Sequence, residues 1–108
     1  MKYFVIKNKK SKTTAAAVVF HDTTALHYII RSNSEAFRKA FEASVRFMGS
    51  TKLVKDGNKL SVSHLGLESD YWAKSVLDKA CGSHWEVIKQ CDFSLDDNVD
   101  SIIKKYLS

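Results

Sequence analysis

Two histidines in the N-terminal half of the chain are the first residues to consider for catalysis. His21 and His27 flank a short polar segment that the residue pattern predicts to be a turn between two strands. Paired imidazoles near lysine could perform general acid–base chemistry on a phosphodiester. A register shift of one residue would move one imidazole to the opposite face of the sheet. Because polar histidines at hairpin turns are common, we interpret the pair as structural and predict no catalytic residues.

Two cysteines and two further histidines could supply metal ligands. Structural zinc sites normally use two closely spaced pairs of ligands. Cys81 and His84 form one such pair, but His64 and Cys91 each lack a close partner. Cys81 stands at the expected end of a helix, where the dipole opposes a thiolate, and Cys91 falls on the apolar face of an expected strand. We therefore predict no metal site, no cofactor and no nucleophilic cysteine.

The common catalytic motifs do not occur in this chain. A Walker loop, a G-x-G-x-x-G loop, a nucleophile elbow and a zinc-protease helix are all missing. The adjacent carboxylates of Asp96 and Asp97 belong to the start of an expected helix, where the helix dipole accounts for them. The sequence therefore predicts a protein that acts by binding rather than by catalysis.

Charge is unevenly distributed along the 108 residues. Residues 1–64 carry twelve basic and four acidic side chains, a balance of +8, whereas residues 65–108 have a balance of −3. Fourteen of the basic residues are lysines and three are arginines, and lysine is a hydrated point charge without the planar fork of arginine. The composition therefore indicates an electropositive surface that attracts anions loosely and does not read base sequence.

Lysines on two expected hairpins form the strongest candidate binding site. One hairpin loop follows the first expected strand, and the other contains Asp56–Gly57, a preferred turn pair. If both hairpins open toward the same side, their lysines form a positive strip that can follow a phosphate backbone. A solvated hairpin that discourages edge pairing is the alternative interpretation. The candidate nucleic-acid-binding residues are Lys7, Lys9, Lys10, Lys12, Lys52, Lys55 and Lys59.

A second and weaker anion site is predicted at Arg31 and Ser32. These residues lie where an expected strand enters a helix, so that a cation would stand beside free backbone N–H groups. The alternative is a helix cap without a ligand.

Aromatic side chains on the N-terminal strands could stack on bases between the lysines. A small domain also needs its large residues inside, so we expect at least half of these aromatics in the core. The residues concerned are Tyr3, Phe4, Phe20 and Tyr28.

Hydrophobic periodicity predicts six strands and three helices. The strands are expected at 3–7, 16–21, 26–31, 52–55, 59–63 and 84–92, and the helices begin near 33, 68 and 95. Ser32 with Glu35 would cap the first helix and Ser94 the last.

These elements predict one α+β domain spanning residues 1–108, with the order βββ-α-ββ-α-β-α. We expect two layers, a mostly antiparallel sheet with all three amphipathic helices on one face. The Asp56–Gly57 turn would place Leu53 opposite Leu60, and alternation in the last strand would place Trp85, Val87 and Cys91 on one face.

The leading functional hypothesis is a small nucleic-acid-associated accessory or regulatory module. One alternative is a protein-interaction module, such as a phage-type inhibitor or adaptor that docks on an acidic host protein. Another is a binder of small anions such as nucleotides. Exposed strand edges, the acidic face of the last helix and the basic half could also combine head-to-tail into a homo-oligomer. No apolar run approaches the ~18 residues of a membrane span, and neither N-terminal apolar run has the length of a secretory signal. We therefore expect a cytoplasmic protein without membrane contact.

Overall fold

Short runs of apolar and β-branched residues build a sheet of antiparallel strands. The computed structural model describes residues 1–11, 15–22, 27–47, 51–64 and 69–107. Within these ranges the strands are β1 (Lys2–Asn8), β2 (Ala15–Asp22), β3 (His27–Ser32), β4 (Thr51–Asp56), β5 (Lys59–His64) and β6 (Trp85–Asp92). They lie in the spatial order β4-β5-β3-β2-β1-β6, and each neighbouring pair is antiparallel.

Three helices complete the described part of the chain. They are α1 (Glu35–Phe47), α2 (Ser69–Cys81) and α3 (Val99–Leu107). The α+β class and the element order βββ-α-ββ-α-β-α are therefore confirmed.

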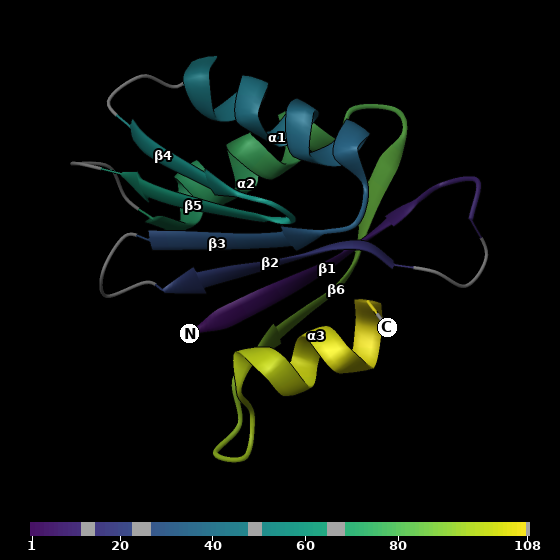
Figure 1. Cartoon of the computed structure of the whole chain (residues 1–108), viewed down its shortest axis with the longest axis vertical. Coiled ribbons are helices and arrows are strands. Elements are labelled where there is room, and N and C mark those ends of the chain that lie inside the picture. Colours follow the sequence, from purple (N-terminus) through teal and green to yellow (C-terminus); the bar gives the residue numbers. More distant parts are fainter. Residues whose placement is uncertain (12–14, 23–26, 48–50, 65–68, 108) are drawn as a thin grey trace.

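The helices cover both faces of the sheet, so the prediction that all three share one face was wrong. Helices α1 and α2 pack together on one face, and α3 lies against the other (Figure 1). The reason is visible in β1 and β2, whose central residues are buried on both sides of the sheet. Uninterrupted apolar runs are typical of strands covered on both faces.

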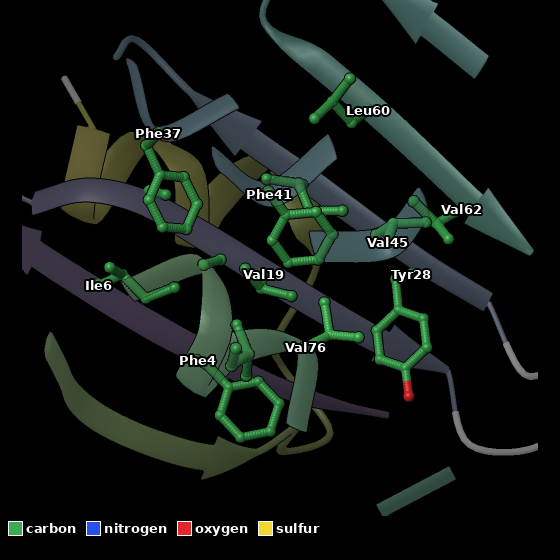
Figure 2. Packing of buried hydrophobic residues seen from close by; sticks show 14 of the residues in the cluster. Phe4, Ile6, Val19, Tyr28, Phe37, Phe41, Val45, Leu60, Val62 and Val76 are labelled. Atoms are coloured by element: carbon green, nitrogen blue, oxygen red, sulfur yellow. The ribbon is translucent and has the colours of Figure 1, made fainter. Parts of the chain in front are cut away.

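Each face has its own apolar core. The larger core joins the sheet to α1 and α2 and includes Phe4, Ile6, Val19, Tyr28, Ile30, Phe37, Phe41, Val45, Leu60, Val62 and Val76 (Figure 2). The smaller core joins the sheet to α3 and consists of Tyr3, Val5, Val18, Phe20 and Ile102.

Helix α1 begins one residue after Ser34, which caps it. The N–H of Phe37 donates to Ser34 Oγ at 3.2 Å, the contact expected of an N-cap residue. Ser32 was the predicted cap, but it continues β3 and is buried. Its hydroxyl donates to the Ala16 carbonyl at 2.6 Å, so it ties β3 to β2 instead.

Helix α3 begins later than Ser94 predicts. The Ser94 N–H donates to an Asp97 carboxylate oxygen at 2.8 Å, which closes a separate turn. Asn98 then caps the helix, because its Oδ1 accepts the N–H of Ser101 at 2.9 Å. As a result Leu95 lies outside the helix and is fully exposed.

The β4–β5 hairpin has the two-residue loop Gly57–Asn58. Gly57 has a φ of 58°, in the left-handed region that glycine adopts at no steric cost. The loop lies one residue later than predicted, so Leu53 opposes Val62 rather than Leu60.

A β-bulge interrupts β6 along its pairing with β1. Ile88 is the extra residue, since its two neighbours oppose consecutive residues of β1. The bulge reverses the alternation of side chains that follow it. Trp85 therefore packs on the α1 and α2 side, which Val87 shares because it is opposite Ile6, whereas Cys91 packs on the α3 side. The prediction that all three share one face was wrong for Cys91.

Candidate functional site

The strand registers place both lysine-bearing hairpins at the same end of the sheet. Arg31, near the end of β3, is opposite Lys59 at the start of β5. The next residue of β3, Ser32, is opposite Ala17 near the start of β2. The end of β1, followed by Lys9 and Lys10, and the β4–β5 turn therefore both lie at this end of the sheet (Figure 1). We call it the basic end and define it by Lys9, Lys10, Arg31 and Lys59.

The first part of the basic end is the turn after β1. The Lys9 N–H donates to the His84 carbonyl at 2.9 Å, and the Lys10 N–H donates to Asn8 Oδ1 at 2.9 Å. Both lysine side chains are exposed. The backbone is thus held in place while the two ammonium groups extend into solvent. Lys12, predicted to act with them, lies outside the described residues.

The second part is a pair of cations held directly opposite one another. Because side chains alternate along a strand and Ile30 faces α1 and α2, Arg31 and Lys59 lie on the other face of the sheet. Opposite residues have Cβ atoms about 4.5–5.5 Å apart, and like charges in that position are destabilising. Among the described residues neither cation forms an ion pair. Asp56 lies opposite Lys59 on β4 and offsets part of this repulsion, but among the described residues it forms no ion pair with Lys59.

The two parts of the basic end are close enough to act together. Three strand spacings separate β5 from β1 in the sheet, a span of about 14 Å. Successive phosphates are ~3.4 Å apart in rise along one strand of DNA. One short segment of nucleic acid can therefore reach both parts.

Three other predicted lysines do not join the basic end. Lys7 Nζ lies 3.9 Å from Glu86 Oε1, and Lys55 Nζ lies 2.9 Å from Glu42 Oε1 on α1. Lys52 lies near the opposite end of the sheet, where β4 begins. These lysines stabilise neighbouring elements or stand apart from the basic end.

Arg31 and Ser32 are not brought together into an anion site. As consecutive strand residues they point to opposite faces of the sheet. The Ser32 side chain is buried and bonded to backbone, and Ser34 already occupies one N–H of the first turn of α1. Arg31 instead lies beside Lys59, its cross-strand neighbour on the same face of the sheet.

A hydrogen-bond network that the sequence did not predict holds the basic end in shape. Arg38 Nη1 donates to the Ser32 carbonyl and, at 3.0 Å, to Asn58 Oδ1. Asn58 Nδ2 donates to Asn33 Oδ1 at 3.1 Å, and Asn33 Nδ2 donates to the Leu107 carbonyl at 3.3 Å. The network joins the β4–β5 turn, the start of α1 and the end of α3. Its only sequence signal is the presence of asparagines next to expected turns.

The two N-terminal histidines do not converge on a common site. His21 is opposite Tyr28 and His27 is opposite Asp22, so the imidazoles point to opposite faces of the sheet. The buried His21 ring stacks on Tyr28, with centroids 4.3 Å apart. This arrangement does not support paired acid–base chemistry.

The aromatic residues of the N-terminal strands are core residues. Tyr3, Phe4, Phe20 and Tyr28 are all buried. The expectation that at least half of them lie in the core is confirmed, and none of the four is placed to stack on a base.

A cleft of about 490 Å³ lies beside the basic end and contains a protonated thiol. Its lining includes Lys9, Asp78, Cys81 and Trp85. Burial, followed by the nearby carboxylate of Asp78, raises the pKa of the Cys81 thiol to about 11. A thiol with this pKa is a poor nucleophile near neutral pH.

We expect Cys81 to react slowly with iodoacetamide in a Cys91→Ser background. Because its pKa lies near 11, the reaction rate of the folded protein should keep rising as pH passes the ordinary thiol value. In urea, where the chain is unfolded, the rate should level off once the pH exceeds the ordinary pKa of a thiol. The neutral thiol is favoured by folding, so its contribution to stability is complete below pH 9 and lost as pH rises toward 11. A native rate that levels off at the same pH as the unfolded rate would contradict this assignment.

Within the described ranges, no three potential metal ligands of the His, Cys, Asp or Glu type form a cluster. The side chain of His64, one of the four residues considered for zinc, lies outside the described part.

None of the described helices has the length and apolar character needed to cross a membrane. Comparison with known proteins found no family model, no curated protein and no solved structure that matches this chain.

Proposed function

We propose that the protein is a non-enzymatic module that binds the phosphate backbone of nucleic acid at its basic end. The observation that carries this proposal is the cross-strand pair of Arg31 and Lys59, at the end of the sheet where Lys9 and Lys10 emerge. Two like charges held in register cost folding free energy. A bound polyanion would remove that cost by neutralising both cations.

The chemistry of the basic end favours contact with phosphates over reading of bases. Three of its four cations are lysines, which attract phosphate as point charges. The candidate stacking residues of β1, β2 and β3 are buried in the two cores. We therefore infer that binding depends on charge density and is largely independent of base sequence.

Fluorescence anisotropy with labelled oligonucleotides at rising salt tests the proposal. If four phosphates are contacted, log Kobs should fall against log salt with a slope of about −3 to −4. Oligonucleotides of unrelated sequence should compete equally. Absence of binding at low salt, or binding that salt does not weaken, would refute the proposal. A partner captured from lysate that survives nuclease treatment would then favour the acidic-protein alternative.

The variant Arg31→Gln should weaken nucleic-acid binding and at the same time stabilise the fold. It removes the repulsion with Lys59 but retains most of the side-chain stem, so we expect up to about 1 kcal/mol of stabilisation. For a domain of this size that corresponds to a few degrees in Tm, roughly 4–8 °C per kcal/mol. Thermal melts and anisotropy on the same samples measure both effects.

Lys52→Gln is the matched control for this variant. It removes one positive charge from a residue opposite Ser63, where no cation opposes it. We expect no gain in Tm and little change in affinity. Destabilisation by Arg31→Gln would show that Arg31 has a structural role instead.

A further inference from the structure

Strand β6 forms an open edge of the sheet. It is the last strand in the spatial order and pairs with β1 on one side. Residues 86–90 are all exposed, including Val87 at 40% and Ile88 at 51%. An exposed edge with apolar side chains is a template for pairing with another strand.

The bulge at Ile88 places Glu86 and Lys89 on the same face of β6. Glu86 is opposite Lys7 and Lys89 is opposite Val5. Lys7 and Val5 are two residues apart in β1 and therefore share a face. Without the bulge, residues three apart in β6 would point to opposite faces.

This spacing makes the edge complementary to itself. In an antiparallel pair of β6 strands, a two-fold axis through the bulge puts Glu86 opposite Lys89 of a second copy, and Lys89 opposite its Glu86. The two faces of the sheet match across such an axis, which is perpendicular to the sheet. In this register Val87 of each copy lies opposite Ile88 of the other, so four apolar side chains gather around the axis. The contact thus contains two symmetry-related Glu86–Lys89 pairs, one on each side of the axis and both on the same face of the continuous sheet.

We propose that the chain forms a two-fold dimer through its β6 edge, so that one sheet continues across both copies. Bulges usually protect edges by twisting them away from a straight partner. Here both strands carry the bulge at the axis, so they bend in the same way. The contact does not use the residues of the basic end, and its test is therefore independent of nucleic-acid binding.

The opposite edge, β4, is less suited to the same contact. Lys55 of β4 is held 2.9 Å from Glu42 of α1, and Asp56 lies opposite Lys59 within the chain. On β6, Glu86 also has a partner within the chain, Lys7, but their charged atoms are 3.9 Å apart and the Glu86 side chain is 45% exposed, so it is still accessible to a second copy. In the described part of the chain, β4 has a single strongly exposed large apolar residue, Val54, whereas β6 has two in succession, Val87 and Ile88. Opposite charges and adjacent apolar residues thus coincide at β6.

Sedimentation equilibrium of the full chain and of charge-swapped variants tests the dimer. We expect the wild type to be dimeric, and Glu86→Lys and Lys89→Glu each to weaken dimerisation by roughly tenfold or more, because two attractive pairs become repulsive. The double variant E86K/K89E restores both pairs with reversed sign and should recover the dimer. Lys89 lies 5.7 Å from the centroid of the Tyr106 ring, and Glu86 lies 3.9 Å from Lys7. The double variant lacks both contacts too, so its recovery isolates the effect between copies.

Two glutamate variants provide an apolar control with equal exposure. Ile88 and Val54 are each 51% exposed on an edge strand, so neither substitution disturbs a core. Ile88→Glu should give a monomer, and Val54→Glu should leave the dimer intact. A monomeric wild type, unchanged dimerisation in both single charge swaps, no recovery in the double swap, or loss of the dimer in Val54→Glu alone would overturn the proposal.

Discussion

Replacing Lys9, Lys10 and Lys59 together with alanine is expected to abolish most of the affinity for nucleic acid. Each lost phosphate contact removes about 0.7–0.9 from the magnitude of the salt slope. The triple variant should therefore have a slope shallower by about two to three. At low salt its affinity should fall by roughly ten- to a hundredfold. Anisotropy titrations at several salt concentrations measure both quantities.

The control for this result removes the same charge from elsewhere on the surface. Lys2 and Lys52 lie toward the opposite end of the sheet, and Lys39 on α1 forms an exposed pair with Glu35 at 3.3 Å. Replacing these three lysines with alanine should reduce affinity only slightly. Equal losses in the two triple variants would mean that net charge, and not the basic end, drives binding.

The second large effect is expected on the free energy of unfolding, when Ile102 in the core between α3 and the sheet is replaced by alanine. Ile102 is 3% exposed and packs against the side chains of β1 and β2. Burial of isoleucine in a well-packed core makes its replacement by alanine cost about 2–5 kcal/mol. A small domain is stable by only about 5–15 kcal/mol in total. Ile102→Ala should therefore lower the urea midpoint strongly.

Leu95→Ala is the matched control for the α3 prediction. Both leucine and isoleucine have four side-chain carbons, but Leu95 is fully exposed before α3 begins. We expect its replacement to change the free energy of unfolding by no more than about 0.5 kcal/mol. Similar, small effects of the two substitutions would contradict the docking of α3 on the second face of the sheet.

Periodicity was sufficient to predict the elements and their order, because each strand and helix has its own local pattern. The placement of α3 was predicted wrongly although β1 contained the signal. Its four buried residues, Tyr3 to Ile6, form an uninterrupted apolar run that requires cover on both faces. Local patterns indicate that such a strand needs two partners, but they do not show which helix supplies the second.

The wrong predictions of the helix caps and of the side-chain alternation in β6 have the same physical origin. Ser32 and Ser34 both precede α1, and the choice between them depends on where β3 stops hydrogen bonding to β2. The bulge at Ile88 likewise depends on the fit between β6 and β1. The pairing between strands from different parts of the chain decides where a strand ends and where a bulge occurs. The sequence of one segment does not contain that information.

The lysine hairpins could be predicted, but their combination with Arg31 could not. Residues 31 and 59 become neighbours because β5 pairs with β3, although α1 and β4 lie between them in the chain. The ion pairs of Lys7 and Lys55 also depend on partners from distant elements. The sequence therefore indicated the sign of the charge, and the register decided which cations gather.

The most direct test of binding at the basic end is to map the contact by NMR. A ¹⁵N-labelled sample of the 12.2 kDa chain is titrated with a short oligonucleotide at low salt. We expect the largest amide shift changes around Lys9, Lys10, Arg31 and Lys59, and small changes around Asp22 and Lys52 at the other end of the sheet. Shift changes concentrated at that other end, or none at all, would contradict the proposed function.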